Sequence, residues 1–410
     1  MANQVEKLNT IAVADIEKIN TLTDDNIEKI NTLEFTSAPA TAGALFRSGY
    51  NAQGEIGDGT TVDRRNLNPA FVQIGSGTDW VWNSGSGQST STSGISYGVK
   101  ADGTAWIWGA AEYGKLGNET TSPNICSPIQ VGSLTDWKQM NGGQSHSMGV
   151  KTDGTLWAWG RNNMGQLGLG DTTDYSSPVQ VGSLTDWSHV VCSFGTTSCL
   201  KTDGTVWGFG QGWYGSMGQG NETDYSSPVQ LGSYTDWTHI ARTVNAAPDF
   251  MGVRGGKLWG CGANSYGGLG TGDTTSYNSP VQIGSLTNWS TVEGGSAGFC
   301  SIKTDGTAWA WGLAYQGMNM DSTDTNRSSP VQIGSLTDWS SIKKPSRFIT
   351  MAIKTDGTFW AAGVATPICG STALAKSSPV QVGSSTAWKS IGSSQGTTSY
   401  GIIGDGPVCS

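Results

Sequence analysis

Few side chains in this sequence belong to the types that perform catalysis or hold metal ions. The chain of 410 residues has three histidines, at positions 146, 189 and 239. His189 and His239 occupy the same position of an internal repeat, two residues after a tryptophan, which favours a structural place in a strand over a role as metal ligand. The motifs of zinc proteases, serine hydrolases, phosphate-binding loops and dinucleotide-binding folds are absent. We therefore expect a protein that is not an enzyme, with no catalytic residue, no cofactor and no metal site.

Two acidic segments and the cysteines are the remaining candidates for metal or redox chemistry. DTTD (171–174) and DSTD (321–324) lack the ligand spacing and the final glutamate of a calcium loop, so we interpret them as solvated turns. None of the seven cysteines belongs to a C-x-x-C pair. Cys192 and Cys199 flank an expected hairpin loop and could form a disulfide there, but reduced, mostly buried thiols are the favoured interpretation.

The charge and hydropathy patterns disfavour two classes of partner. The formal net charge is -9 and no basic stripe is present to neutralise phosphates, so nucleic acid is not expected. No apolar run approaches the roughly 18 residues of a membrane span. The start, MANQVEKLNT, lacks the apolar segment of a secretory signal peptide. The 60 glycines and 18 tryptophans favour short strands and many tight turns around large aromatic side chains.

The elements that position any functional residue come from a repeat of about 50 residues, which is clearest at 151–187. Each copy begins at a tryptophan and has four short segments; the second ends in KTDG, the third resembles TLWAWG and the fourth resembles SPVQVG. Period-two alternation indicates strands, and Asp-Gly indicates a hairpin turn. Seven copies of four antiparallel strands predict a β-propeller. The seven tryptophans are Trp80, Trp137, Trp187, Trp237, Trp289, Trp339 and Trp388.

The two ends of the chain complement each other. After Trp388 the chain has only a second strand (400–403) and an Asp-Gly turn, whereas ALFRSG (44–49) and FVQIG (71–75) have the patterns of a third and a fourth strand. Both termini are therefore predicted to build one blade and to close the ring, which removes open sheet edges. The predicted fold class is all-β: a seven-bladed β-propeller of four-stranded antiparallel blades over residues 43–410, with a short N-terminal helical arm.

The repeat resembles that of a known family of propellers. GRNNMGQLGLGD (160–171), after a strand that ends in Trp-Gly, is similar to the repeat of the regulator-of-chromosome-condensation-like (RCC1-like) propellers, and the resemblance spans about nine tenths of the chain. It implies the propeller fold. The family's nucleotide-exchange activity on a small GTPase is not expected, because only scaffold motifs match. Weaker copies are YNAQGEIGDG (50–59), AAEYGKLGNE (110–119), GWYGSMGQGN (212–221) and GANSYGGLGTGD (262–273).

Alternating strand direction assigns the loops to two faces. The Asp-Gly turns and the GSLTDW connections fall on one face and are nearly identical in every copy. The other loops fall on the opposite face and differ between copies, so they are the expected binding surface, although ordinary loop drift would give the same pattern. An aromatic pair beside polar loops there suits a sugar or a protein partner. The candidate partner-binding residues are Trp213, Tyr214, Arg242, Asp249, Phe250, Lys343, Lys344, Arg347 and Phe348.

The first 35 residues contain a different and shorter repeat. VEKLNT (5–10), IEKINT (16–21) and IEKINT (27–32) recur at a spacing of 11 residues, which predicts short helical turns separated by kinks. One apolar stripe in so short a segment needs a partner, so 1–35 is predicted to be a docking or oligomerisation arm. The alternatives are a helix packed on its own domain and disorder. TSAPATA (36–42) is the expected linker. The apolar stripe of the arm consists of Val5, Leu8, Ile16, Ile19, Ile27, Ile30 and Leu33.

The arm also resembles the short I-x-K-I-N repeats of phage and prophage structural proteins, with matches at 16–20 and 27–31. That resemblance implies a non-enzymatic virion protein, such as a tail, fibre or capsid-decoration protein. Its arm would bind other virion proteins or copies of itself, and its propeller loops would bind a partner or a host-surface glycan. The alternative is a cytoplasmic bacterial propeller that mediates protein–protein interactions.

Overall fold

The computed structural model describes residues 42–64, 71–86, 94–243, 249–344, 349–363, 376–393 and 399–404. The predicted arm, with all seven residues of its apolar stripe, lies outside these ranges, as does the linker up to residue 41. Residues 41–410 form one compact unit. The described part is nearly all β, with a few short 3-10 turns. Among these residues there is no helix with the length and apolar composition that a membrane crossing requires.

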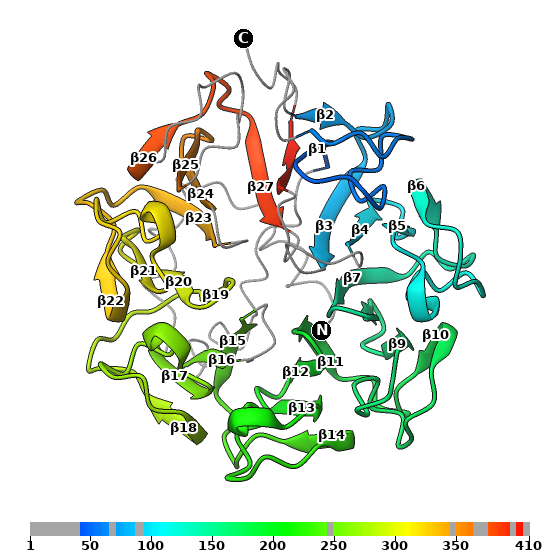
Figure 1. Cartoon of the computed structure of the whole chain (residues 1–410), viewed down its shortest axis with the longest axis horizontal. Helices are drawn as coiled ribbons and strands as arrows, with labels where there is room; N and C mark the ends of the chain where they lie inside the picture. Colours follow the sequence, from blue (N-terminus) through cyan, green and yellow to red (C-terminus); the bar gives the residue numbers. More distant parts are fainter. Residues whose placement is uncertain are drawn as a thin grey trace, which may run out of the picture. The chain divides into compact units, whose positions relative to one another are not determined.

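Seven four-stranded sheets follow one another around a ring (Figure 1). The predicted seven-bladed propeller of antiparallel blades is confirmed. We name the four strands of each blade A to D from the centre of the ring outward. The A strands, such as β7 and β11, pack on one another around the centre, and the D strands, such as β10 and β14, form the rim.

The blades have the following strands, in the order A to D. Blade 1 has β3 (Trp80–Ser86), β4 (Ile95–Lys100), β5 (Ala105–Gly109) and β6 (Ile125–Gln130). Blade 2 has β7 (Trp137–Gly142), β8 (His146–Lys151), β9 (Leu156–Gly160) and β10 (Tyr175–Gln180). Blade 3 has β11 (Trp187–Cys192), β12 (Thr196–Lys201), β13 (Val206–Gly210) and β14 (Tyr225–Gln230). Blade 4 has β15 (Trp237–Arg242), β16 (Asp249–Arg254), β17 (Lys257–Gly262) and β18 (Tyr277–Gln282).

Blade 5 has β19 (Glu293–Gly294), β20 (Phe299–Ile302), β21 (Ala308–Gly312) and β22 (Arg327–Gln332). Blade 6 has β23 (Trp339–Lys343), β24 (Ile349–Lys354), β25 (Phe359–Gly363) and β26 (Lys376–Gln381). Blade 7 has β27 (Trp388–Ser393), β28 (Ser399–Ile403), β1 (Ala44–Ser48) and β2 (Val72–Gln73).

Blade 7 closes the ring as the sequence predicts. Its strand order is β27-β28-β1-β2, so the two ends of the propeller share one sheet. β1 pairs antiparallel with β28 over five residues, from Ala44 opposite Ile403 to Ser48 opposite Ser399. Since every blade now has a neighbour on both sides, the ring has no exposed first or last sheet face.

The turns between strands B and C are three-residue loops in blades 1, 2, 3, 5 and 6, whereas blade 4 has the two-residue turn Gly255-Gly256. In blade 2 the Lys151 N–H donates to Thr155 O, and the Gly154 N–H donates to Lys151 O. Gly154 has φ +80°, the left-handed conformation that ends this loop type. Asp153 accepts hydrogen bonds from the Thr155 N–H and hydroxyl at 2.9 and 2.7 Å, and these bonds lower the pKa of its carboxyl group.

Each of blades 1 to 6 is also held by a basic residue at or next to the end of strand B. In blade 2 the Lys151 Nζ lies 5.1 Å from the ring centroid of Trp137 in strand A and 4.2 Å from that of Trp157 in strand C. It also lies 3.4 Å from an Asp136 carboxylate oxygen. Strands A, B and C are thereby joined by cation–π contacts worth about 0.5 to 2 kcal/mol each. The equivalent residues are Lys100, Lys201, Arg254, Lys303 and Lys354.

Cys192 and Cys199 have free thiols, like Cys126, Cys261 and Cys300. The register explains this, because Val190 lies opposite Cys199 and Cys192 lies opposite Thr197, so the two cysteines are diagonal neighbours. Diagonal Cα atoms lie roughly 7 to 8 Å apart, beyond the usual span of about 4.4 to 6.8 Å for a disulfide. The favoured interpretation, reduced and mostly buried thiols, is confirmed for the described cysteines.

The contacts of the B–C turn predict that two glycines differ in how much their replacement by alanine destabilises the protein. A Cβ at Gly154 would collide with the carbonyl oxygen of Thr185, whereas a Cβ at Gly182, φ +61°, would have no atom within 4 Å. Gly154→Ala should therefore destabilise the propeller by about 3 kcal/mol, and Gly182→Ala by about 1 kcal/mol, because only the first adds a collision to the backbone strain. Urea unfolding of both variants measures the difference. Equal decreases in the free energy of unfolding for the two variants would contradict the close contact between the B–C turn and the D–A connection.

The thiols of blade 3 give a second prediction. Burial raises the pKa of Cys192 to about 12 and that of Cys199 well above its usual value, so neither forms the reactive thiolate in the folded protein. Both should resist 5,5′-dithiobis(2-nitrobenzoate) under native conditions and react in guanidinium chloride. Peptide mapping without reductant, after alkylation in denaturant, should find both residues alkylated; a linked 192–199 peptide pair would disprove the free-thiol structure.

Candidate binding site on the loop face

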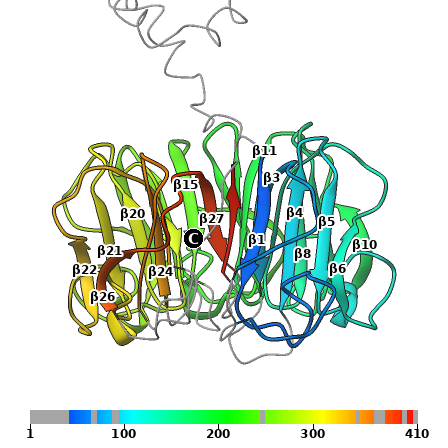
Figure 2. The same cartoon turned by 90° about the horizontal axis from the view of Figure 1, so that it is seen from above.

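The strands run between two faces of the ring (Figure 2). We call the face that carries the B–C turns and the D–A connections the turn face, and the face that carries the A–B and C–D loops the loop face. On the turn face, the Gly103 carbonyl accepts the Trp137 N–H, so a turn of blade 1 is bonded to the start of blade 2. The candidate site therefore has to be sought in the loops of the other face.

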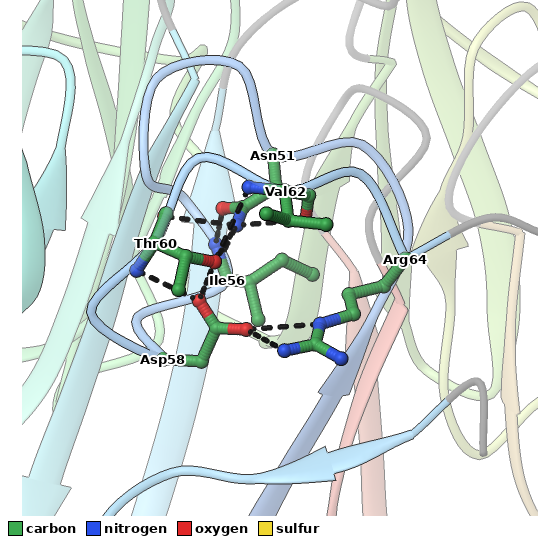
Figure 3. Close-up of polar contacts among 6 residues, drawn as sticks. All are labelled: Asn51, Ile56, Asp58, Thr60, Val62 and Arg64. Atoms are coloured by element: carbon green, nitrogen blue, oxygen red, sulfur yellow. Dashed lines mark hydrogen bonds and ion pairs between the residues drawn. The ribbon is translucent and has the colours of Figure 1, made fainter. Parts of the chain in front are cut away.

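The C–D loops of blades 2, 4 and 7 have an internal hydrogen-bond network around one asparagine. In blade 7, Asn51 Oδ1 accepts the Ile56 N–H at 2.8 Å, and Asn51 Nδ2 donates to the carbonyl oxygens of Thr60 and Val62 at 3.0 and 3.1 Å (Figure 3). Asp58 accepts the Thr60 hydroxyl and forms an ion pair of 2.6 Å with Arg64. Burial opposes ionisation of Asp58, but the bonds from Thr60 and Arg64 lower the pKa of its carboxyl group overall.

The same network recurs in blades 2 and 4. Asn162 Oδ1 accepts the Leu167 N–H at 3.0 Å, and Asn264 Oδ1 accepts the Leu269 N–H at 2.9 Å. Both asparagines also donate through Nδ2 to a backbone carbonyl nine residues later, at Asp171 and at Asp273. An asparagine that bonds both ends of a loop restricts its conformations, so these loops have defined shapes.

The C–D loops of blades 1, 2, 5 and 7 are also bonded to the next blade. In blade 1, the carbonyl oxygen of Lys115 accepts the Ser147 hydroxyl at 2.7 Å and the Trp159 indole N–H at 2.8 Å, both from blade 2. Because this bond uses the main chain, the side chains at the tip of the loop remain available for other contacts. Equivalent bonds run from Ser96 to Glu55 O, from Thr197 to Gln166 O and from Thr350 to Met318 O.

Large aromatic side chains are exposed on the C–D loops of blades 1, 3, 4 and 5. They lie in the 3-10 turns η3 (Glu112–Gly114), η4 (Trp213–Gly215), η5 (Ser265–Gly267) and η6 (Tyr315–Gly317). Tyrosine and tryptophan are the side chains that most often dominate binding interfaces, so these positions are candidate contact residues. The exposed fractions are 38% for Tyr113, 46% for Trp213, 44% for Tyr214, 52% for Tyr266 and 50% for Tyr315.

Three of these tyrosines have a strained backbone. Tyr113, Tyr214 and Tyr266 have φ values of +59°, +55° and +59°. This left-handed conformation costs about 1 to 2 kcal/mol for a side chain other than glycine. Their exposed fractions lie between 38% and 52%, so the backbone conformation does not favour an aromatic residue here and packing accounts for it only in part.

A crevice lies beside the first of these tyrosines, between blades 1 and 2. It has a volume of about 420 Å³ and is lined by Tyr113, Thr121, Asp174 and Ser176. The Arg161 guanidinium carbon lies 4.5 Å from the Tyr113 ring centroid. One aromatic ring, two hydroxyls and a carboxylate therefore converge where the loops of two blades meet.

The structure supports the predicted exposure of two candidate residues and corrects four others. Trp213 and Tyr214 are exposed on the loop face. Arg242 is buried between blades 3 and 4, where Nε donates to Ser198 Oγ at 2.9 Å and Nη2 donates to Ser216 O at 3.0 Å. Arg242 therefore stabilises a blade interface and offers no contact to a partner.

Asp249, Phe250 and Lys344 are buried as well. Asp249 accepts the Asn264 N–H at 2.9 Å, and burial raises the pKa of its carboxyl group to about 7. Phe250 packs edge-on against Trp237, 5.7 Å between ring centroids. Lys344 Nζ donates to the carbonyl oxygens of Trp311 and Leu313 at 2.9 Å each, and burial lowers the pKa of its amine to about 7.

The remaining predicted residues divide into two groups. Lys343 is partly exposed and forms an ion pair with Glu293 of the neighbouring A strand. Arg347 and Phe348 lie outside the described residues. Within the described ranges, no three His, Cys, Asp or Glu side chains are grouped closely enough to hold a metal ion.

Sequence reasoning missed Tyr113, Tyr266 and Tyr315. A signal was present, because Tyr113, Tyr214 and Tyr266 each directly precede the glycine that aligns with Gly165 of the clearest repeat copy. Only their shared left-handed backbone shows that the three positions are equivalent and strained.

Comparison with known proteins agrees with the repeat assignment. Residues 102–150, 153–200 and 255–300 match the profile of the Regulator of chromosome condensation (RCC1) repeat, and residues 137–166 match a second profile of that repeat. The chain thus carries RCC1 repeats.

The curated relatives match only in part. Ultraviolet-B receptor UVR8 of Arabidopsis thaliana is 30% identical over 34% of this chain and 30% of its own length. The probable E3 ubiquitin-protein ligase HERC3 of Homo sapiens is 38% identical over 18% of this chain and 7% of its own length. Protein RCC2 of Homo sapiens is 33% identical over 18% of this chain and 15% of its own length. The matched region therefore spans less than a third of each relative.

Solved structures share the fold over most of the chain. Human WBSCR16 aligns with a TM-score of 0.74 and 18% identity, over 89% of this chain and 99% of that one. Prp20p from Saccharomyces cerevisiae, described with its binding to Gsp1p and histones, aligns with a TM-score of 0.72 and 15% identity, over 89% and 92%. Identities this low establish a common fold alone.

The strained tyrosines predict an unusual response to mutation. Tyr113→Gly, Tyr214→Gly and Tyr266→Gly should leave the free energy of unfolding unchanged or raise it by up to about 1 kcal/mol, because glycine relieves the left-handed strain and little packing is lost. The control is Tyr277→Gly in strand β18, which removes a 2.9 Å hydrogen bond to Asp273 and should destabilise. Thermal unfolding measures all four. Clear destabilisation by the first three would show that these rings serve folding instead of binding.

Proposed function

We propose that this chain is a non-enzymatic binding protein that presents its loop face to a partner. The observation that carries the proposal is the set of exposed aromatic side chains on hydrogen-bonded C–D loops, three of them in strained backbone. Tyrosine and tryptophan on a rigid support lose little conformational entropy on binding, which makes them effective contact residues. The sequence supplies no catalytic motif that would compete with this role.

Proteins of the same fold support partner binding in general. Yeast Prp20p has binding properties toward Gsp1p and histones, and a separate crystal structure contains Kap60 bound to yeast RCC1 (Prp20). The sequence identity to Prp20p is only 15%, so the partner of this chain is proposed to differ from Gsp1p, histones and Kap60. In its general form, the proposal is that the loop face binds a protein or another macromolecule.

The finer form places this activity on a virus particle. Its support is the I-x-K-I-N repeat within residues 1–35, which resembles the arms of phage structural proteins. In this proposal the arm anchors the chain to other virion proteins or to its own copies, and the loop face points toward a host or particle ligand. The alternative, a cytoplasmic bacterial interaction propeller, is favoured by the protein partners of the yeast structures.

Deletion of residues 1–36 tests the anchoring role. The truncated chain should keep the far-ultraviolet spectrum and melting of the propeller but should no longer assemble, because the apolar stripe of the arm is gone. Light scattering gives the assembly state of both forms. A milder variant, Ile19→Asp with Ile30→Asp, serves as the matched test in the full-length chain. Assembly that is unchanged by both alterations would refute an anchoring arm.

Mass spectrometry of purified particles from the source of the sequence separates the two settings. The virion proposal requires this chain among the particle proteins. The cytoplasmic interaction propeller would be favoured by two results together. The chain is absent from the particles, and a soluble cellular protein binds to the immobilised natural protein but not to the immobilised Tyr214→Gly variant.

A further inference from the structure

We propose that the crevice between blades 1 and 2 binds a sugar ring, with Tyr113 as the stacking platform, and that the loop face is a glycan-binding surface. This inference rests on the proposed binding role of the loop face and names its ligand class. It is carried by the geometry at Tyr113 and by the recurrence of that geometry in two further blades.

Two blades supply the walls of the crevice. Tyr113 and Thr121 belong to the C–D loop of blade 1, whereas Asp174 and Ser176 belong to blade 2. The crevice is open to solvent, with a volume of about 420 Å³, so a ligand would rest against it instead of being enclosed. The two walls are fixed relative to each other, because Lys115 O, two residues after Tyr113, accepts bonds from Ser147 and Trp159 of blade 2.

The Tyr113 ring is oriented before any ligand arrives. Its backbone is set at φ +59°, ψ 15°, by the turn η3, in which Gly114 N–H donates to Ala111 O. The Arg161 guanidinium 4.5 Å from the ring centroid adds a contact that fixes the ring further. A fixed aromatic face is suited to the C–H face of a sugar ring, since the negative face of the π system attracts weakly positive hydrogens and pre-orientation lowers the entropic cost of binding.

The polar groups of the crevice match the hydroxyl edge of a sugar. Asp174 Oδ1 accepts the Asn162 N–H at 2.7 Å, which orients the carboxylate. Among the described residues, no hydrogen bond is made by Asp174 Oδ2 or by the hydroxyls of Thr121 and Ser176. A carboxylate oxygen accepts from a sugar hydroxyl, and the two protein hydroxyls both donate and accept. Charged acceptors make the stronger of these bonds.

The charge balance favours a neutral ligand. Asp174 is the charged lining residue and disfavours an anion, while the Arg161 guanidinium on the Tyr113 ring offsets its attraction for a cation. A protein partner would need a contiguous apolar core to bury. The crevice instead has a single ring among polar groups, and the neighbouring exposed aromatic residues belong to other blades. Neutral hexoses or N-acetylhexosamines are therefore the ligand class that the chemistry fits.

The arrangement recurs around the loop face. In blade 1 the glycine after the tyrosine, Gly114, lies against Ser176 of the next blade. In the same way Gly215, after Tyr214, lies against Asn278, and Gly267, after Tyr266, lies against Ser328. Three exposed tyrosines thus stand beside a polar residue of the following blade.

Several weak sites on one rigid ring would act together on a ligand that repeats along a surface. Linked sites gain avidity without any new contact, provided that the geometry allows simultaneous engagement. A repeating polysaccharide or a dense layer of surface glycans has this property, whereas a free monosaccharide does not.

The test is an array of immobilised neutral glycans probed with the full-length protein, followed by calorimetric titration with the oligosaccharide that binds best. Tyr113→Ala should weaken binding of that oligosaccharide about tenfold or more, by analogy with aromatic stacking on flat ligands. Tyr113→Phe should bind within about threefold of the natural protein, because it keeps the ring.

Two further variants keep the test interpretable. Asp174→Asn should fold normally, because asparagine caps the equivalent loops through Asn124 and Asn326, yet it should weaken binding several-fold. Leu184→Ala removes a side chain of similar exposure, 47%, from the D–A connection on the turn face and should change nothing.

Two outcomes overturn the proposal: no glycan is bound by the natural protein, or the oligosaccharide binds equally well to Tyr113→Ala. If a protein ligand is then found whose binding needs Tyr113, Tyr214 or Tyr266, the glycan inference fails while the proposed role of the loop face stands. If no ligand of any class depends on these tyrosines, both fail.

Discussion

The propeller depends on a cation held between two tryptophans. The Lys151 amine lies 4.2 Å from the Trp157 ring and 5.1 Å from the Trp137 ring, and Asp136 balances its charge. This cluster joins strands A, B and C of one blade, and it is repeated with lysine or arginine in the six blades that have a B–C turn among the described residues. The inner tryptophan is also packed edge-on against the second aromatic residue of strand C in blades 1, 2 and 5, as Trp137 is against Trp159. Trp137 also packs in one cluster with Tyr97 and Val99 of blade 1, so the same side chain joins the strands of its blade and contacts the neighbouring blade.

The two faces of the ring differ in how much their sequence can vary between blades. On the turn face the Asp-Gly turn, the threonine after it and the following connection are all bound to one another, which explains why the repeat is nearly uniform there. On the loop face the attachment to the next blade runs through a backbone carbonyl, such as that of Lys115. A main-chain acceptor is indifferent to the side chain that carries it, so the loop tips can differ between blades while the ring stays closed.

Buried basic side chains also connect neighbouring blades through hydrogen bonds. Arg47, Arg242 and Lys344 cross blade interfaces and donate to carbonyl and hydroxyl oxygens of a neighbouring blade. A charge that is removed from water has to be hydrogen-bonded, and loop carbonyls at the blade interfaces are the available acceptors. The sequence places these charged residues near the ends of strands, which suggests that they lie on the surface. It does not show in which direction each side chain points.

The sequence alone determined the number of blades, the four strands of each, the closure by both termini and the two faces, because the tryptophan marker, the period-two pattern and the Asp-Gly turn are local signals. It also identified Trp213 and Tyr214 as exposed aromatic residues. Only the tertiary structure decided that Arg242, Asp249, Phe250 and Lys344 face the interior, and that Tyr113 and Asp174, which lie 61 positions apart, line one crevice. Burial and juxtaposition depend on how one blade sits against the next, and no local pattern encodes that packing.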